Sequence, residues 1–150
     1  MSRVLNPIWL LILFSAWVRA GEGLVVMPSS HDFDGTFERL EQAVQSAGLV
    51  VFAKFDHSSA ATEAGMTLSP SKVLVFGNPK LGTKLMSANP AIAVDLPLRV
   101  AVWQDASGNV TLVYTSPDYL LARFGIGDEQ EIVKKMSGLL EGLGKAATSP

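Results

Sequence analysis

Cysteine is absent from this sequence of 150 residues, and histidine occurs only twice. The lack of cysteine excludes disulfide bonds, thiol catalysis and thiolate ligation of a metal. An ordinary zinc site needs three or four clustered His, Cys or carboxylate ligands, so one is not expected within a single chain. The fold must therefore be held together by its apolar core.

Positive charge is also scarce, with 12 Lys and Arg residues against 14 Asp and Glu residues. Loss of residues 1–20 would remove Arg3 and Arg19, which leaves 10 basic residues and a net charge of −4. Binding to nucleic acid needs a basic surface, so nucleic acid is not an expected partner.

Residues 1–20 have the pattern of a secretory signal peptide: a positive start, an apolar core over 8–18 and a small-residue exit at Val18-Arg19-Ala20. We predict cleavage after Ala20 and a periplasmic or secreted location. The apolar core is shorter than the roughly 20 residues that cross a bilayer, so no membrane association is expected after cleavage. An uncleaved anchor is the alternative.

The first half of the remaining chain predicts two strands and two helices. Residues 23–27 form a short apolar run ended by Pro28. Asp32 is an N-cap candidate for a helix with apolar residues at helical spacing up to Ala47. A second apolar run at 49–55 predicts another strand, and the alanine-rich 59–64 predicts a short helix.

The second half predicts an antiparallel pair of strands and a long final helix. Strands at 98–104 and 110–115 flank a glycine-containing loop. Ser116-Pro117 starts a helix, and Asp128 with Glu131 forms a capping box for the last one. Residues 146–150 are expected to be a flexible tail.

This order predicts a single α+β domain over residues 21–145. It runs strand, helix, four strands with small helices inserted, then helix, with a mainly antiparallel sheet and the main helices on one face. A sheet with one uncovered face commonly finds a partner, and we predict a homodimer.

A dense run of turn residues follows the buried strand Val73–Phe76. In Gly77-Asn78-Pro79, Asn78 can cap a helix and Pro79 suits its first position. The backbone N–H groups there could hold an anion, or Gly77 merely relieves a tight turn.

Charged residues lie near these turns. Lys80, Lys84 and Arg99 could bind a carboxylate or phosphate, or could be solvated surface charges. Asp95 is either part of such a site or a structural cap and partner of Arg99.

The two histidines differ in how well they qualify as functional residues. His31 precedes the predicted cap of the first helix and is expected to be exposed and incidental. His57 ends a strand beside Asp56, just before a short helix. The two residues could form an acid–base pair, or Asp56 caps the helix while His57 packs locally.

His57 is the expected ligand if the protein holds a cofactor. Haem is the first candidate, because one axial histidine in an apolar pocket suffices, and a single transition metal is the second, shared across a dimer axis. Met66 and Met86 are further axial candidates, although methionine more often fills the core. The expected pocket walls are Phe52, Phe55, Met66, Phe76 and Met86.

Four motifs occur in a defined order and spacing, namely Asp56-His57, Gly77-Asn78-Pro79, Asn89-Pro90 and Asp95-Leu96-Pro97. In this combination the chain resembles the domain-of-unknown-function family numbered 302, from about Gly23 to Leu143. The resemblance implies a compact α+β domain of the order given above, usually dimeric. It also places a histidine at position 57, and it implies no shared activity.

Three functions remain open at this point. The first, which we favour, is a non-enzymatic exported domain that holds a small ligand or haem in an apolar pocket near His57. The second is an enzyme that uses Asp56 and His57 as acid and base, and the third is a structural, dimeric interaction module. An enzyme should show a second convergent polar group near His57, whereas its neighbours are mostly apolar. The ligand-site candidates are Asp56, Gly77, Asn78, Pro79, Lys80, Asp95 and Arg99, beside the cofactor candidates His57, Met66 and Met86.

Overall fold

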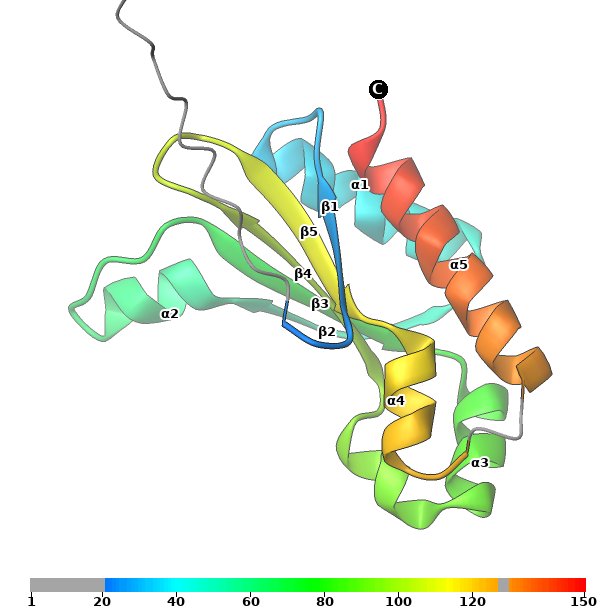
Figure 1. Cartoon of the computed structure of the whole chain (residues 1–150). Coiled ribbons are helices and arrows are strands. Elements are labelled where there is room, and N and C mark those ends of the chain that lie inside the picture. The colour runs from blue at the N-terminus through cyan, green and yellow to red at the C-terminus, as the bar shows by residue number, and fades with distance from the viewer. Residues whose placement is uncertain (1–20, 127–129) are drawn as a thin grey trace, which may run out of the picture.

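The structure is a computed structural model that describes residues 21–126 and 130–150. The expected signal peptide and Asp128 of the expected capping box lie outside the described residues. Five strands form one antiparallel sheet in the order β1-β5-β4-β3-β2 (Figure 1). The strands are β1 (Leu24–Pro28), β2 (Val50–Asp56), β3 (Ser71–Gly77), β4 (Leu98–Gln104) and β5 (Val110–Thr115).

Helices connect and cover these strands. They are α1 (Phe33–Ser46), α2 (His57–Glu63), α3 (Pro79–Ala88), the 3₁₀ helix η1 (Pro90–Val94), α4 (Pro117–Arg123) and α5 (Gln130–Thr148). The two longest, α1 and α5, lie side by side against one face of the sheet (Figure 1). The predicted α+β class, element order and placement of the main helices are confirmed.

The main core lies between the sheet and these two helices. Because strand side chains alternate, each row across the sheet faces one way. One row of this face joins Val25, Tyr114, Val100 and Leu74 in register. Against it pack buried side chains of α1 and α5, which are Phe33, Phe37, Leu40, Val44, Leu140, Leu143 and Ala147.

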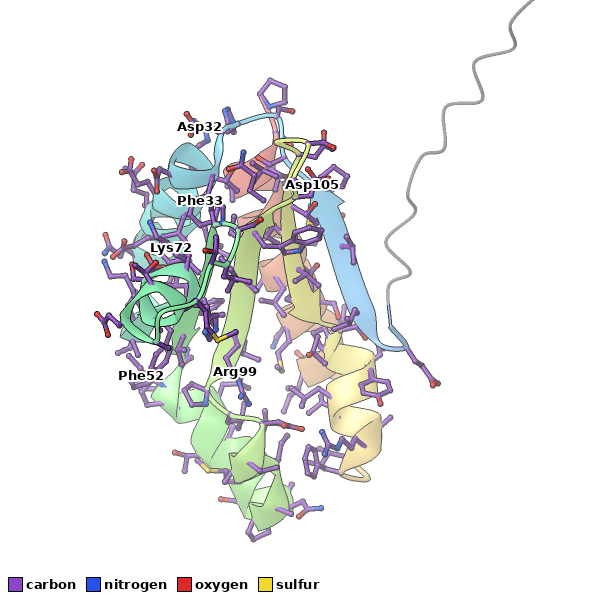
Figure 2. The ribbon with its side chains drawn as sticks, turned by 90° about the vertical axis from the view of Figure 1, so that its left-hand side faces the viewer. Asp32, Phe33, Phe52, Lys72, Arg99 and Asp105 are labelled. Carbon is purple, nitrogen blue, oxygen red and sulfur yellow. The ribbon has the colours of Figure 1, made fainter. Side chains whose placement is uncertain are left out.

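The opposite face of the sheet is also apolar. The neighbouring row joins Val26, Val113, Ala101 and Val73, and all four side chains are only partly buried. Figure 2 looks onto the molecule from this side. Homodimerisation through this face stays a prediction.

A second core lies beyond one end of the sheet, where α3, η1 and α4 gather (Figure 1). Its buried members are Leu85, Ile92, Leu120, Leu121, Ile126 and Met136. Asn89 caps η1 by accepting from the Ala91 N–H (3.0 Å), and its amide donates to the Phe124 carbonyl (2.7 Å). The Asn-Pro turn therefore fastens η1 to the end of α4.

The prediction of a flexible tail over residues 146–150 is wrong for residues 146–148, because α5 continues to Thr148. Ala147 is fully buried, and the Ser30 N–H donates to the Thr148 carbonyl at 2.9 Å. The apolar period of α5 runs on through Ala147, so its last turn packs on the main core.

Candidate functional site

The side chains singled out in the sequence lie at three places rather than one. Asp56 and His57 start α2, and Met66 follows it. Gly77-Asn78-Pro79 and Met86 line an apolar cavity beside α3. Asp95 and Arg99 line a different, partly charged cavity between β4 and α4.

Asp56 is the N-cap of α2. Its Oδ1 atom accepts from the Ser59 N–H (2.9 Å) and from the Ser58 hydroxyl (2.7 Å). These bonds, the Ser59 bond first, hold the pKa of the Asp56 carboxyl below its usual range. A carboxylate that is so weakly basic is a poor proton acceptor near neutral pH.

His57 is exposed, and α2 carries no buried residue. The walls expected around it do not enclose it: Phe76 is fully buried in the main core, whereas Phe55 and Met66 are 54% and 69% exposed. Strand alternation directs Phe76 toward the helices. The residues around His57 therefore do not fit a haem, which needs an apolar pocket.

The described part of the chain also does not assemble a metal site at His57. Within residues 21–126 and 130–150, no group of three or more His, Asp or Glu side chains is placed to hold a metal ion.

The apolar cavity has a volume of about 580 Å³ and lies where β3 passes into α3. Its walls come from the β2 edge, α3, the segment before β4, and α5. They are Phe52, Gly77, Asn78, Pro79, Leu81, Gly82, Thr83, Leu85, Met86, Ala93, Leu96, Pro97, Leu98 and Met136.

Two local features shape this cavity. The register of β2 against β3 shifts between Val51 and Ala53, so Phe52 sits in a β-bulge, a feature that re-aims side chains. A β-carbon added to Gly77 would lie 3.5 Å from Phe52 Cε2 and 3.6 Å from Pro97 Cβ. The missing side chain at Gly77 thus leaves space between these two rings.

The predicted anion site at the start of α3 is already filled from within the chain. The Asn78 side-chain oxygen accepts from the N–H groups of Lys80 (3.0 Å) and Leu81 (3.4 Å). Lys80 is exposed and does not line the apolar cavity. Asn78 therefore serves as a cap, and the expected partnership of Gly77-Asn78-Pro79 with Lys80 does not form.

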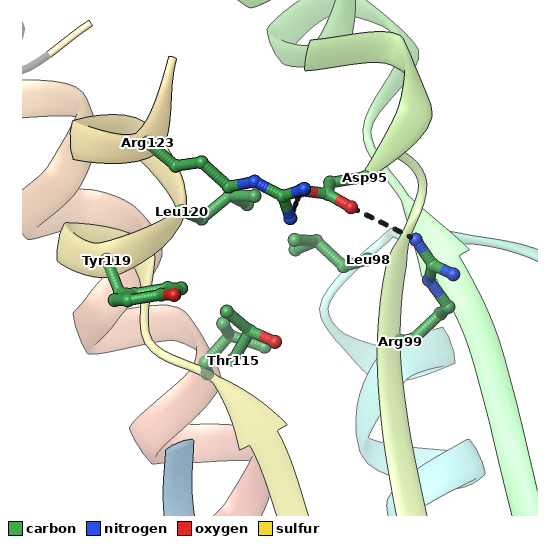
Figure 3. Close-up of a pocket in the computed structure, with 8 residues that line it drawn as sticks. Asp95, Leu98, Arg99, Thr115, Tyr119, Leu120 and Arg123 are labelled. Atoms are coloured by element: carbon green, nitrogen blue, oxygen red, sulfur yellow. Dashed lines mark hydrogen bonds and ion pairs between the residues drawn. The ribbon is translucent and has the colours of Figure 1, made fainter. Parts of the chain in front are cut away.

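The second cavity, about 340 Å³, is called here the arginine cavity (Figure 3). Arg123 Nη1 lies 2.8 Å from Asp95 Oδ2, and Arg99 Nη2 lies 3.8 Å from Asp95 Oδ1. Arg99 Nη2 also donates to the Val94 carbonyl at 3.2 Å. The other lining residues are Leu98, Thr115, Tyr119, Leu120 and Leu140.

Sequence reasoning paired Asp95 with Arg99 but missed Arg123. Arg123 ends α4, 28 residues beyond Asp95, and no local spacing connects them. Tyr119 was also missed as a site residue. Gly23, just before β1, has a positive φ of 77°, and a β-carbon there would collide with the Tyr119 ring, so the backbone at Gly23 packs closely against this ring.

The family described as "Domain of unknown function DUF302" matches residues 25–143. Over 113 residues the chain is 39% identical to proteins named "Fluoride-specific ion channel FluC 1" from Brucella suis and Brucella abortus. The match covers 75% of this chain but only 44% and 42% of those proteins. The chain thus spans less than half the length of these curated relatives.

A solved structure has the same fold. The uncharacterized conserved protein DUF302 from Bacillus stearothermophilus aligns with a TM-score of 0.76 at 20% identity. The alignment covers 85% of this chain and 99% of that one. None of the helices described here has the length and apolar composition that crossing a bilayer requires.

Proposed function

Because the chain belongs to the family of domain of unknown function DUF302, whose description specifies no activity, we propose a function from its own geometry. The protein is an exported, non-enzymatic domain that binds a small apolar molecule in the apolar cavity. The observation that carries this proposal is the cavity itself: about 580 Å³, walled mainly by apolar side chains. Ligand pockets typically range from about 300 to 1,000 Å³ and have this kind of lining.

The lining defines the class of ligand. Among the described residues that line the cavity none is charged, so a charged group would lose its hydration there without gaining a partner from them. The Asn78 side-chain oxygen is already bonded to two backbone N–H groups. The ligand that fits is therefore neutral and largely apolar, and its binding is driven by burial of apolar surface.

The cavity is lined both by buried side chains with fixed positions and by a more exposed methionine that can change conformation. Leu85 and Met136 belong to the second core and are almost fully buried, so they form a fixed floor. Met86 is 37% exposed at the rim. A methionine side chain adapts readily to ligands of different shape, so we expect tolerance among apolar ligands of similar size.

Binding is favoured over catalysis by the position of the titratable groups. Asp56 is engaged as a helix cap, and neither it nor His57 lines the apolar cavity. An enzyme would need its acid and base beside the bound substrate.

The relatives named as fluoride channels do not change this assignment. Their name applies to whole proteins, of which this chain matches less than half. The part that it matches has here a layered α+β fold, with charged residues such as Glu38 and Arg39 exposed on α1. We therefore assign the shared segment a binding role beside the channel rather than conduction.

The test uses the neutral fluorescent probe N-phenyl-1-naphthylamine and a pair of glycine variants. Gly82 lines the cavity and a β-carbon there meets nothing within 4 Å, so Gly82→Leu should fill the space. Gly138 on α5 is exposed and equally open, so Gly138→Leu is the matched control. Both variants remove a helical glycine, and both should fold.

We expect the wild type and Gly138→Leu to bind one probe per chain, and Gly82→Leu to bind at least about tenfold more weakly. Equal probe affinity in all three proteins would place the probe elsewhere and refute the cavity as its site. Absence of saturable binding to the wild type would refute the proposed function itself.

A further inference from the structure

Two arginines from distant parts of the chain converge on one carboxylate in the arginine cavity (Figure 3). Arg99 comes from β4 and Arg123 from the last turn of α4, and both face Asp95. Two positive charges against one negative charge leave the cavity with a net charge of about +1. The Asp95 side chain is only 23% exposed, so its charge lies inside the cavity and is shared between the two arginines.

Most of the hydrogen-bonding capacity of these arginines is unused within the described residues. A guanidinium has five N–H donors. Arg123 uses one nitrogen on Asp95, and Arg99 uses one on the Val94 carbonyl, with its Asp95 contact at 3.8 Å. The hydroxyl groups of Thr115 and Tyr119 line the same cavity, and the part of the chain described here offers neither a hydrogen-bond partner.

The floor of the arginine cavity is apolar. Leu120 and Leu140 are 3% and 2% exposed, and Leu98 completes this surface. A ligand that fills the cavity must therefore present an anionic group to the arginines and an apolar part to the leucines.

We propose that the arginine cavity is a second binding site, which takes a small organic monocarboxylate with a short apolar chain. The planar fork of a guanidinium matches a carboxylate. A net charge of about +1 suits a monoanion. The second negative charge of a phosphate dianion would have no positive partner left, because Asp95 already neutralises one arginine. A bare halide would leave the leucine floor uncovered. This site goes beyond the proposed function, because its ligand class and its residues differ from those of the apolar cavity.

The test is isothermal titration of the folded protein with hexanoate, acetate, inorganic phosphate and fluoride. We expect hexanoate to bind one per chain, and acetate, phosphate and fluoride to bind at least about tenfold more weakly. Arg123→Gln and Arg99→Gln should each weaken hexanoate binding about tenfold or more. Arg39→Gln, the same change on the exposed face of α1, should leave it unaltered.

Asp95→Asn separates a binding site from a structural ion pair. Loss of the internal carboxylate leaves two arginines unneutralised, so hexanoate should bind more tightly and phosphate should gain the most. Gly82→Leu, which fills the apolar cavity, should leave hexanoate binding unchanged. Thermal unfolding of each variant confirms that it is folded at the assay temperature.

Three results overturn the proposal. The first is hexanoate affinity that is equal in the wild type, Arg99→Gln and Arg123→Gln, or no saturable binding at all. The second is loss of hexanoate binding in Gly82→Leu, which would move this ligand to the apolar cavity. The third is fluoride or phosphate binding as tight as that of hexanoate, which would change the ligand class. The first and third results leave binding of the neutral probe untouched, whereas the second would also extend the ligands of the apolar cavity to an anion.

Discussion

His31 donates a hydrogen bond from its Nε2 atom to the carbonyl oxygen of Ser149, at 2.7 Å. The two residues are 118 positions apart, and the contact joins the loop before α1 to the end of α5. His31 was expected to be incidental and Ser149 to lie in a flexible tail. Together with the bond from the Ser30 N–H to the Thr148 carbonyl, this contact fixes the end of α5 against the loop.

We predict that deletion of residues 147–150 lowers the free energy of unfolding by about 1–3 kcal/mol, because it removes the fully buried Ala147 and the last turn of α5. His31→Ala should cost less, about 0.5–1.5 kcal/mol, for one lost hydrogen bond. Ser149→Ala keeps the accepting backbone carbonyl and should be neutral. Urea unfolding measures all three. A deletion variant as stable as the wild type would show that the end of α5 does not contribute.

The glycines of α5 should respond differently to a methyl group. At the exposed Gly142 a β-carbon meets nothing within 4 Å, so Gly142→Ala should raise helix propensity and stabilise the protein by about 0.5–1 kcal/mol. At the buried Gly144 the added carbon would collide with Met27 Sδ and lie 3.8 Å from Leu112 Cδ2. Gly144→Ala should therefore gain nothing or destabilise.

Thermal unfolding of both alanine variants beside the wild type gives the comparison. Equal stabilisation at the two positions would mean that β1 does not approach α5 as closely as Gly144 and Met27 indicate.

Asp56 should make stability depend on acid pH. Its hydrogen bonds to Ser59 and Ser58 lower its pKa in the folded protein relative to the unfolded chain. A lowered folded pKa means that this stabilisation is fully present above the unfolded value, near 3.9, and is lost as pH falls through the folded pKa. Asn can still cap α2 but does not titrate. Asp56→Asn should therefore lose less stability than the wild type between about pH 5 and pH 2.

Urea unfolding at several pH values in this range checks the prediction. Asp118→Asn is the control, because the Asp118 side chain is exposed and makes no hydrogen bond among the described residues. Wild-type-like acid sensitivity in Asp56→Asn would argue that the cap does not control this pH dependence.

Helix starts were the part of the structure most directly readable from the sequence. The expected caps Asp32, Asn78 and Ser116 all accept from backbone N–H groups two or three residues ahead. Such bonds lie within one turn of chain, so neighbouring residues suffice to predict them. The short helix begins at His57 rather than Ser59, because Asp56 supplies its cap.

The candidate site was harder to predict. Sequence proximity grouped Phe76 with His57, but strand alternation places Phe76 in the main core. Phe52 does line a cavity, yet it does so through a β-bulge that the sequence does not reveal. Among the glycines of α5, the close approach to Met27 occurs at Gly144, and no local pattern distinguishes this glycine from its neighbours.

The sequence by itself determined the α+β class, the order of the strands and helices, the caps, and which helix faces are apolar. These follow from local hydrogen bonding and from the periods of 2 and 3.6 residues that strands and helices impose. Only the tertiary structure decided that Gly77 and Phe52 border one cavity while Arg99, Arg123 and Asp95 share another. Those groupings depend on strand register and on how α3, α4 and α5 pack at the end of the sheet. Both are set by contacts between residues far apart in the chain, which no local pattern encodes.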